Sequence, residues 1–103
     1  MSMKIIYTPL SKQNLLHIKQ FIAKDKKIAS ENFMTRLKLA IENLINFPYK
    51  FRQSYYYLDE NIRDMTFSGY SIIYRINIAD EVIEILEIFN QNLPEIGKEK
   101  TSK

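Results

Sequence analysis

The sequence predicts an α+β domain in which an antiparallel pair of helices packs on one face of a β-sheet. Two observations support this fold class. Apolar residues recur at helical spacing over two stretches between residues 9 and 47, and from residue 62 onward they alternate with polar ones as in strands. Pro48 separates the two regions, because the residue before a proline is pushed out of the helical conformation. A chain of 103 residues can bury one core and shows no linker, so we expect residues 1–103 to form a single domain.

The N-terminal part predicts a short strand followed by a helix. Residues 3–8 are rich in β-branched and aromatic side chains, which favour strands. Thr8 and Pro9 fit the N-cap and the first helical position, where the missing N–H of proline costs no hydrogen bond. The apolar stripe that this helix is expected to bury consists of Leu15, Leu16, Ile18, Phe21 and Ile22.

A second, longer helix is expected after the polar break at residues 25–27, and it should extend to about Asn46. Its apolar face consists of Ala29, Phe33, Leu37, Ala40, Ile41, Leu44 and Phe47. Two amphipathic helices with so short a connection form an antiparallel hairpin. Each has one apolar stripe, so the pair must lie on another layer, which the strands supply.

The second half of the chain predicts an antiparallel meander of three strands. Residues 62–67 form its first strand, and Ser68 and Gly69 form a hairpin turn. Residues 70–78 alternate between apolar and polar side chains, which predicts a long strand with one strongly apolar face.

The last predicted strand follows a turn at residues 79–81. Residues 82–89 fit a helical stripe as well as a strand, but the run is short and rich in β-branched side chains, which favours a strand. The charged residues from about 93 to 103 are expected to form a flexible tail.

Composition excludes several kinds of site. The chain has no cysteine, which rules out disulfides, thiolate metal ligands and cysteine nucleophiles. His17 is the one histidine and lacks partners at metal-ligand spacing, so we interpret it as a surface residue and expect neither a metal nor a small-molecule cofactor. The absence of a signal peptide and of a long apolar run leads us to expect a cytoplasmic protein without membrane contact.

The net charge of +3 admits two interpretations. It is compatible with an ordinary solvated surface, or with an acidic partner such as RNA, DNA or an acidic protein segment. Residues 49–57 sharpen the second interpretation, because Lys50 and Arg52 alternate there with aromatic side chains. Such a mixture suits a nucleic acid or a protein hot spot, although the same aromatics can simply cover the core beneath them.

Arg63 and Arg75 lie within predicted strands and suit either contact with a partner or a cross-strand ion pair. Tyr70 and Tyr74 share the apolar face of their strand, so we interpret them as core residues. The acidic side chains of the last strand, Glu84 and Glu87, are expected to face solvent.

Several stretches together resemble the RelE/ParE superfamily of toxins from bacterial type II toxin–antitoxin systems. Leu44 followed by Phe47 and Pro48 is similar to the end of the family's second helix. The strands at residues 62–65, 69–76 and 83–89 resemble three strands of the family, the middle one through Gly-Tyr-Ser-Ile-Ile-Tyr-Arg-Ile. The resemblance runs from about Met3 to Asn92 and implies a toxin neutralised by a cognate antitoxin.

The family divides by target. RelE-like members bind the ribosomal A site and cut mRNA, whereas ParE-like members bind DNA gyrase and block it. Where the nucleases carry basic or other catalytic residues, this chain has Ser71 on the long strand, Ile62 and Asp64 on the strand before it, and Asn90 and Gln91 near the end of the last strand. The resemblance therefore favours the ParE-like branch, a toxin that inhibits gyrase by binding rather than by catalysis.

Two alternatives remain open. A RelE-like mRNA endonuclease would have to use Lys50, Arg52, Arg63 and Tyr70 as its catalytic groups. A non-toxic interaction module is the second alternative. The residues expected to contact a partner are Arg52, Tyr55, Tyr56, Arg63, Arg75, Asn90 and Gln91.

Overall fold

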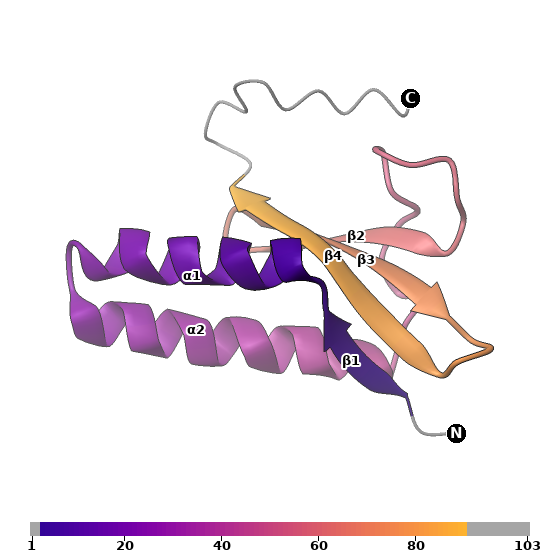
Figure 1. The fold of residues 1–103 in the computed structure, drawn as a ribbon, viewed down its shortest axis with the longest axis horizontal. Coiled ribbons are helices and arrows are strands. Elements are labelled where there is room, and N and C mark those ends of the chain that lie inside the picture. Colours follow the sequence, from indigo (N-terminus) through magenta and orange to yellow (C-terminus); the bar gives the residue numbers. More distant parts are fainter. Residues whose placement is uncertain (1–2, 91–103) are drawn as a thin grey trace.

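The computed structural model describes residues 3–90, so the predictions for Gln91 and for the tail beyond it lie outside the described residues. Figure 1 shows two helices side by side, packed against a sheet. The elements in chain order are β1 (Lys4–Tyr7), α1 (Pro9–Ala23), α2 (Lys27–Glu42), a 3₁₀ turn η1 (Asn43–Ile45), β2 (Ile62–Phe67), β3 (Tyr70–Asn77) and β4 (Val82–Asn90).

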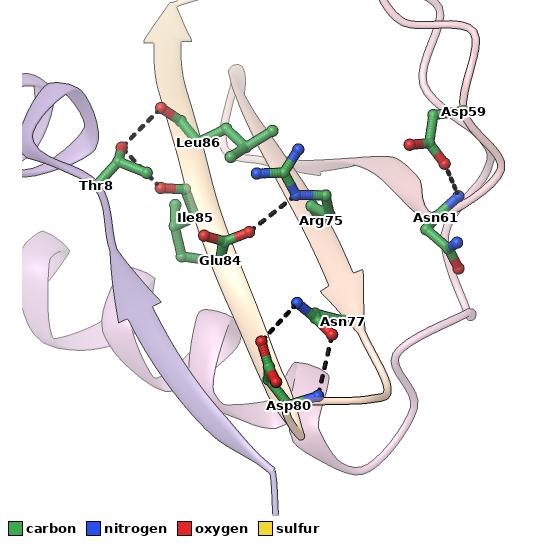
Figure 2. Close-up of polar contacts among 9 residues, drawn as sticks. All are labelled: Thr8, Asp59, Asn61, Arg75, Asn77, Asp80, Glu84, Ile85 and Leu86. Atoms are coloured by element: carbon green, nitrogen blue, oxygen red, sulfur yellow. Dashed lines mark hydrogen bonds and ion pairs between the residues drawn. The ribbon is translucent and has the colours of Figure 1, made fainter.

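The start of α1 is fixed by its N-cap, as the sequence predicts. The backbone N–H of Ser11 donates to the Thr8 hydroxyl oxygen at 3.1 Å, and Pro9 takes the first helical position. The same hydroxyl donates toward the carbonyl oxygens of Ile85 and Leu86, each 3.0 Å away (Figure 2). The cap therefore joins the helix to β4 as well as starting it.

The two helices form the predicted antiparallel hairpin. Ser30 is fully buried where they approach each other, and its hydroxyl donates to the Lys19 carbonyl of α1 at 2.8 Å. The α-helical geometry of α2 ends at Glu42, and the chain continues through η1 to Ile45 and then reaches Pro48. The helix is thus slightly shorter than predicted, because its last turn tightens into a 3₁₀ turn.

The sheet has the strand order β1-β4-β3-β2. Strands β2, β3 and β4 form the predicted antiparallel meander, and Ser68 and Gly69 turn the first hairpin with positive φ angles of 51° and 84°. Strand β1 pairs in parallel with β4, so the sheet is mixed rather than wholly antiparallel. The helical hairpin supplies the crossover that a parallel pairing requires.

The helices cover one sheet face, as expected, but each buries a narrower stripe than its apolar residues suggested. Leu16 and Phe21 of α1 are 53% and 57% exposed, Phe47 is 61% exposed, and Ala29 also faces solvent. Ile78 lies beyond the end of β3 and is exposed as well. Helices lying side by side turn part of their apolar surface away from the sheet. The residues that form the core with β3 and β4 include Ile18, Phe33, Leu37, Ile41 and Leu44.

The face opposite the helices is also partly buried, which corrects one expectation. Glu87 is only 3% exposed rather than facing solvent. The register between β3 and β4 shifts between Ile73 and Tyr74, so that Glu84 and Glu87, three residues apart, fall on the same face. The residues of β4 beyond this shift therefore face the side of the sheet that simple alternation does not predict.

Candidate functional site

The segment 46–61 is fastened along the outer edge of β2. The Ser54 N–H donates to the Ile62 carbonyl at 2.8 Å, and the Asp64 N–H donates to the Arg52 carbonyl at 3.1 Å. Gln53 forms an isolated antiparallel bridge with Arg63. This segment, which we call the edge loop, therefore pairs with part of the sheet edge that would otherwise be open.

The edge loop then crosses the sheet on the face opposite the helices. The Tyr55 N–H donates to Asp64 of β2 at 3.0 Å, and the Tyr56 ring meets Phe89 of β4 edge-on, with 5.6 Å between the ring centroids. Since β3 lies between these two strands, the crossing accounts for the burial of Ser71 and Ile73. The aromatic residues of the loop thus do cover apolar surface, as one interpretation of the sequence held.

Asp64 is the polar centre of this contact, although it was not among the predicted site residues. Its side chain is 1% exposed; Oδ2 lies 3.4 Å from the Arg52 guanidinium and accepts the Tyr55 N–H, while Oδ1 has no hydrogen-bond partner among residues 3–90. The guanidinium in turn lies 3.5 Å from the centre of the Tyr55 ring. The sequence carried little signal for this role, because β2 also contains Arg63 and Thr66 and a charged residue in such a strand is as compatible with the solvent face.

The Arg52–Tyr55 pair combines anchoring with exposure. The Arg52 side chain is 41% exposed and Tyr55 is 66% exposed, so both present surface to a partner. The contact with buried Asp64 holds the arginine in place. A pre-ordered arginine stacked on an aromatic ring is typical of the residues that dominate protein–protein interfaces.

Arg63 serves the edge loop itself. Its guanidinium donates to the carbonyls of Glu60 and Phe51 at 2.9 and 3.0 Å, and it lies over the Tyr49 ring at 4.8 Å. These contacts replace the cross-strand ion pair that one sequence interpretation held, and the Arg63 side chain remains partly exposed. Its placement makes it a residue that positions the loop.

Tyr74 holds the same loop from the helix side of the sheet. It is fully buried, and its hydroxyl donates to the Pro48 carbonyl at 2.7 Å. Burial raises the pKa of Tyr74 above its ordinary value of 10.0, although the charge of Arg63 opposes this shift. The prediction that Tyr74 is a core residue is confirmed.

Arg75 forms the cross-strand ion pair that was one of its two interpretations. Its Nε atom lies 2.8 Å from Oε1 of Glu84 on the neighbouring strand (Figure 2). The two side chains are 44% and 28% exposed, so the pair is accessible to a partner but contributes little stability.

The remaining predicted residues are dispersed. Tyr70 is buried against Phe33, with ring centroids 5.5 Å apart, and pairs with Asn90 at the far end of the sheet. Tyr70 lies four residues along β3 from Tyr74, a distance of about 13 Å, and Tyr74 is the pairing partner of Arg63. The structure therefore groups Lys50, Arg52 and Arg63 around the edge loop and leaves Tyr70 apart from them.

Other kinds of site are not evident in residues 3–90. That range holds no cluster of three or more metal-ligating His, Asp or Glu side chains, and no helix within it is long and apolar enough to cross a membrane. His17 is exposed, as interpreted, at the rim of a cavity of about 390 Å³ between α1 and the adjacent ends of β3 and β4.

The fold and this surface define a small α+β protein with an exposed, stacked arginine–aromatic pair beside the outer sheet strand. The sequence profile of the family described as "ParE toxin of type II toxin-antitoxin system, parDE" matches residues 5–92. The chain belongs to this family, which confirms the predicted superfamily and its ParE-like branch.

Two solved structures share the fold. A structure titled "Chromosomal ParDE TA system from P. aeruginosa" superposes with a TM-score of 0.68 at 14% identity, covering 85% of this chain and 95% of that one. The isolated E. coli RelE toxin superposes with a TM-score of 0.63 at 11% identity, covering 93% and 92% of the two chains. No curated protein matches the chain in sequence.

Proposed function

We propose that this ParE-family toxin inhibits DNA gyrase by binding it and is neutralised by a cognate antitoxin in the cytoplasm. The family match supports a toxin, and the placement of charge supports binding over RNA cleavage. Cutting RNA requires groups that activate a 2′-hydroxyl and stabilise a pentavalent phosphate, and these must be accessible to the substrate.

The observation that carries the proposal is the chemistry of the sheet face opposite the helices. Its arginines, Arg52 and Arg75, are each paired with a carboxylate, and Asp64 and Glu87 are buried there. A face with buried carboxylates and paired arginines has little free positive charge for a phosphate. The exposed Arg52–Tyr55 pair suits a protein surface instead.

A supercoiling assay with purified gyrase tests the target. The wild-type protein should inhibit supercoiling, and Arg52→Ala and Tyr55→Ala should each weaken inhibition about tenfold or more, as expected for interface hot spots. Thr35→Ala on the exposed surface of α2 is the matched control and should inhibit like the wild type. Normal supercoiling combined with cleavage of ribosome-bound mRNA would support the RelE-like alternative. If the protein neither inhibits supercoiling nor cleaves mRNA, a non-toxic interaction module is indicated.

The antitoxin is expected to dock where the helices meet the sheet. The cavity between α1 and the strand ends is lined by apolar side chains that include Ile18, Phe21 and Ile88. A disordered acidic segment can fold into such a groove and add a strand at an open sheet edge. Co-expression with the candidate antitoxin should raise the thermal midpoint, because a ligand that binds only the folded state stabilises it, whereas an unchanged midpoint with excess antitoxin would contradict the proposal.

A further inference from the structure

The first half of the edge loop borders an apolar hollow that the proposed function does not use. The hollow has a volume of about 160 Å³ and lies between the end of α2, the 3₁₀ turn η1 and the outer edge of β2. Its lining includes Phe47, which is 61% exposed, and Phe51 of the loop, together with Met65 and Phe67 of β2. A cavity of about 150 Å³ holds a benzene ring, so this hollow can take one apolar side chain.

Two cations lie beside the hollow without an opposing charge. The Nζ atom of Lys50 lies 5.4 Å from the centre of the Phe51 ring, and the guanidinium of Arg36 lies 5.9 Å from the centre of the Phe67 ring. No acidic residue lines the hollow, and within residues 3–90 neither cation forms an ion pair with a carboxylate. The hollow therefore suits an apolar side chain that has carboxylates beside it.

The second half of the same loop presents that combination. Leu58 is 86% exposed, and the exposed residues Asp59 and Glu60 follow it directly. Two hydrogen bonds fix this turn: the Asn61 N–H donates to Oδ1 of Asp59 at 2.8 Å (Figure 2), and the Ile62 N–H donates to the Asp59 carbonyl at 3.0 Å. Within residues 3–90, neither carboxylate forms an ion pair. The loop thus displays a pre-ordered apolar knob, Leu58, with two carboxylates next to it.

We propose that the protein forms a two-fold dimer in which Leu58 of each protomer enters the hollow of the other. Asp59 and Glu60 then face the lysine and the arginine beside that hollow. Leu58 does not occupy the hollow of its own chain, since it is 86% exposed. One surface carries both complementary parts, and a two-fold axis pairs such a surface with itself, so the apolar and the charged contacts are each formed twice.

The dimer goes beyond the proposed function and does not depend on the target. Self-association is measured with the purified protein alone, so the failure of either proposal leaves the other intact. A nucleic acid fits this surface less well than a second copy, because the carboxylates of Asp59 and Glu60 would repel its phosphates. A second copy instead matches both the apolar parts and the charges of opposite sign.

Sedimentation velocity over about a hundredfold range of protein concentration measures the dimer. The wild type should change from monomer to dimer with a dissociation constant in the micromolar range, as expected of a small interface, and added salt should raise this constant. Leu58→Ser removes the apolar contact twice in each dimer, so a loss of about tenfold per contact raises the dissociation constant about a hundredfold. Leu16→Ser, at a leucine of α1 that is 53% exposed and outside the lining of the hollow, is the matched control and should dimerise like the wild type.

Reversing one charge on each side of the contact gives the sharpest test. Lys50→Glu and Glu60→Lys should each weaken self-association, because each brings like charges together at both contacts. An equal mixture of these two variants should dimerise again, because one contact is then that of the wild type and the other has both charges reversed. Lys4→Glu, on the strand at the opposite edge of the sheet, is the control for the lysine change and should dimerise like the wild type.

Three results would overturn the proposal. A wild-type protein that stays monomeric at every concentration would leave the hollow and the knob to other proteins. A dimer that Leu58→Ser leaves unchanged would be formed by another surface. A mixture of the two charge variants that stays as monomeric as each variant alone would show that these charges do not meet. Circular dichroism of each variant confirms that the fold is retained, which substitutions at these exposed positions should allow.

Discussion

Replacing Tyr74 by phenylalanine tests how the edge loop is held to the sheet. The tyrosine is fully buried, and its hydroxyl donates a 2.7 Å hydrogen bond to the Pro48 carbonyl. Phenylalanine keeps the ring that packs in the core but leaves the carbonyl without this donor. Losing a neutral hydrogen bond costs about 1 kcal/mol, and leaving the carbonyl of the half-buried Pro48 without its donor adds a similar amount, so we expect a loss of about 2 kcal/mol.

Urea unfolding measures this loss, with Tyr70→Phe as the matched control. Tyr70 lies on the same strand and face and is also buried, but in the described part of the chain its hydroxyl has no hydrogen bond. With an unfolding slope of about 2 kcal/mol per molar urea, Tyr74→Phe should lower the midpoint by about 1 M. Tyr70→Phe should change stability by less than about 0.5 kcal/mol.

The location of the effect is checked by amide exchange. In Tyr74→Phe the amides of residues 46–51 should exchange faster, while those of β3 and β4 follow only the global loss of stability. Equal destabilisation by the two tyrosine variants, or unchanged exchange in the loop, would show that the Pro48 contact does not anchor the loop.

Three further predictions concern the same framework. Arg63→Ala removes two hydrogen bonds to loop carbonyls and should cost about 2 kcal/mol and admit protease cleavage within residues 50–60, which limited trypsin or chymotrypsin digestion would detect. A double-mutant cycle of Arg75→Ala and Glu84→Ala should give a coupling of about 0.5 kcal/mol, because the pair is partly exposed; a coupling above about 2 kcal/mol would contradict this. Burial raises the pKa of Tyr74, and burial with the nearby charge of Glu42 raises that of Tyr7, so the folded state keeps protons that the unfolded state releases. The stability that these two tyrosines contribute should therefore be fully present below about pH 10 and be lost as the pH rises above it, with a shallower fall in Tyr74→Phe when unfolding is measured across alkaline pH.

Local signals in the sequence predicted most of the fold. Thr8 and Pro9 marked the start of α1, and alternation after residue 62 marked the strands, because capping and side-chain period act over a few residues. The parallel pairing of β1 with β4 could not be predicted this way, since it joins Ile5 to Ile83 across most of the chain. The apolar pattern also predicts burial of Phe21 and Phe47, which are exposed, because a pattern does not show how much of each helix face the neighbouring elements cover.

The site was predictable in composition but not in geometry. The mixture of basic and aromatic residues around Arg52 indicated a recognition surface, and the structure makes Arg52 and Tyr55 a stacked, exposed pair. The partner that holds them, Asp64, was missed because its role depends on a loop contact nine residues away. The burial of Glu87 was missed because it depends on a register shift between strands.

Pulse labelling in a growing bacterium tests whether this toxin acts on gyrase by binding. The protein is induced in a bacterium, and incorporation of labelled thymidine and labelled methionine is followed over the first minutes. DNA synthesis should fall first while translation continues, and Arg52→Ala should delay the fall. An early loss of translation with intact DNA synthesis would contradict a gyrase target and identify a ribosomal one.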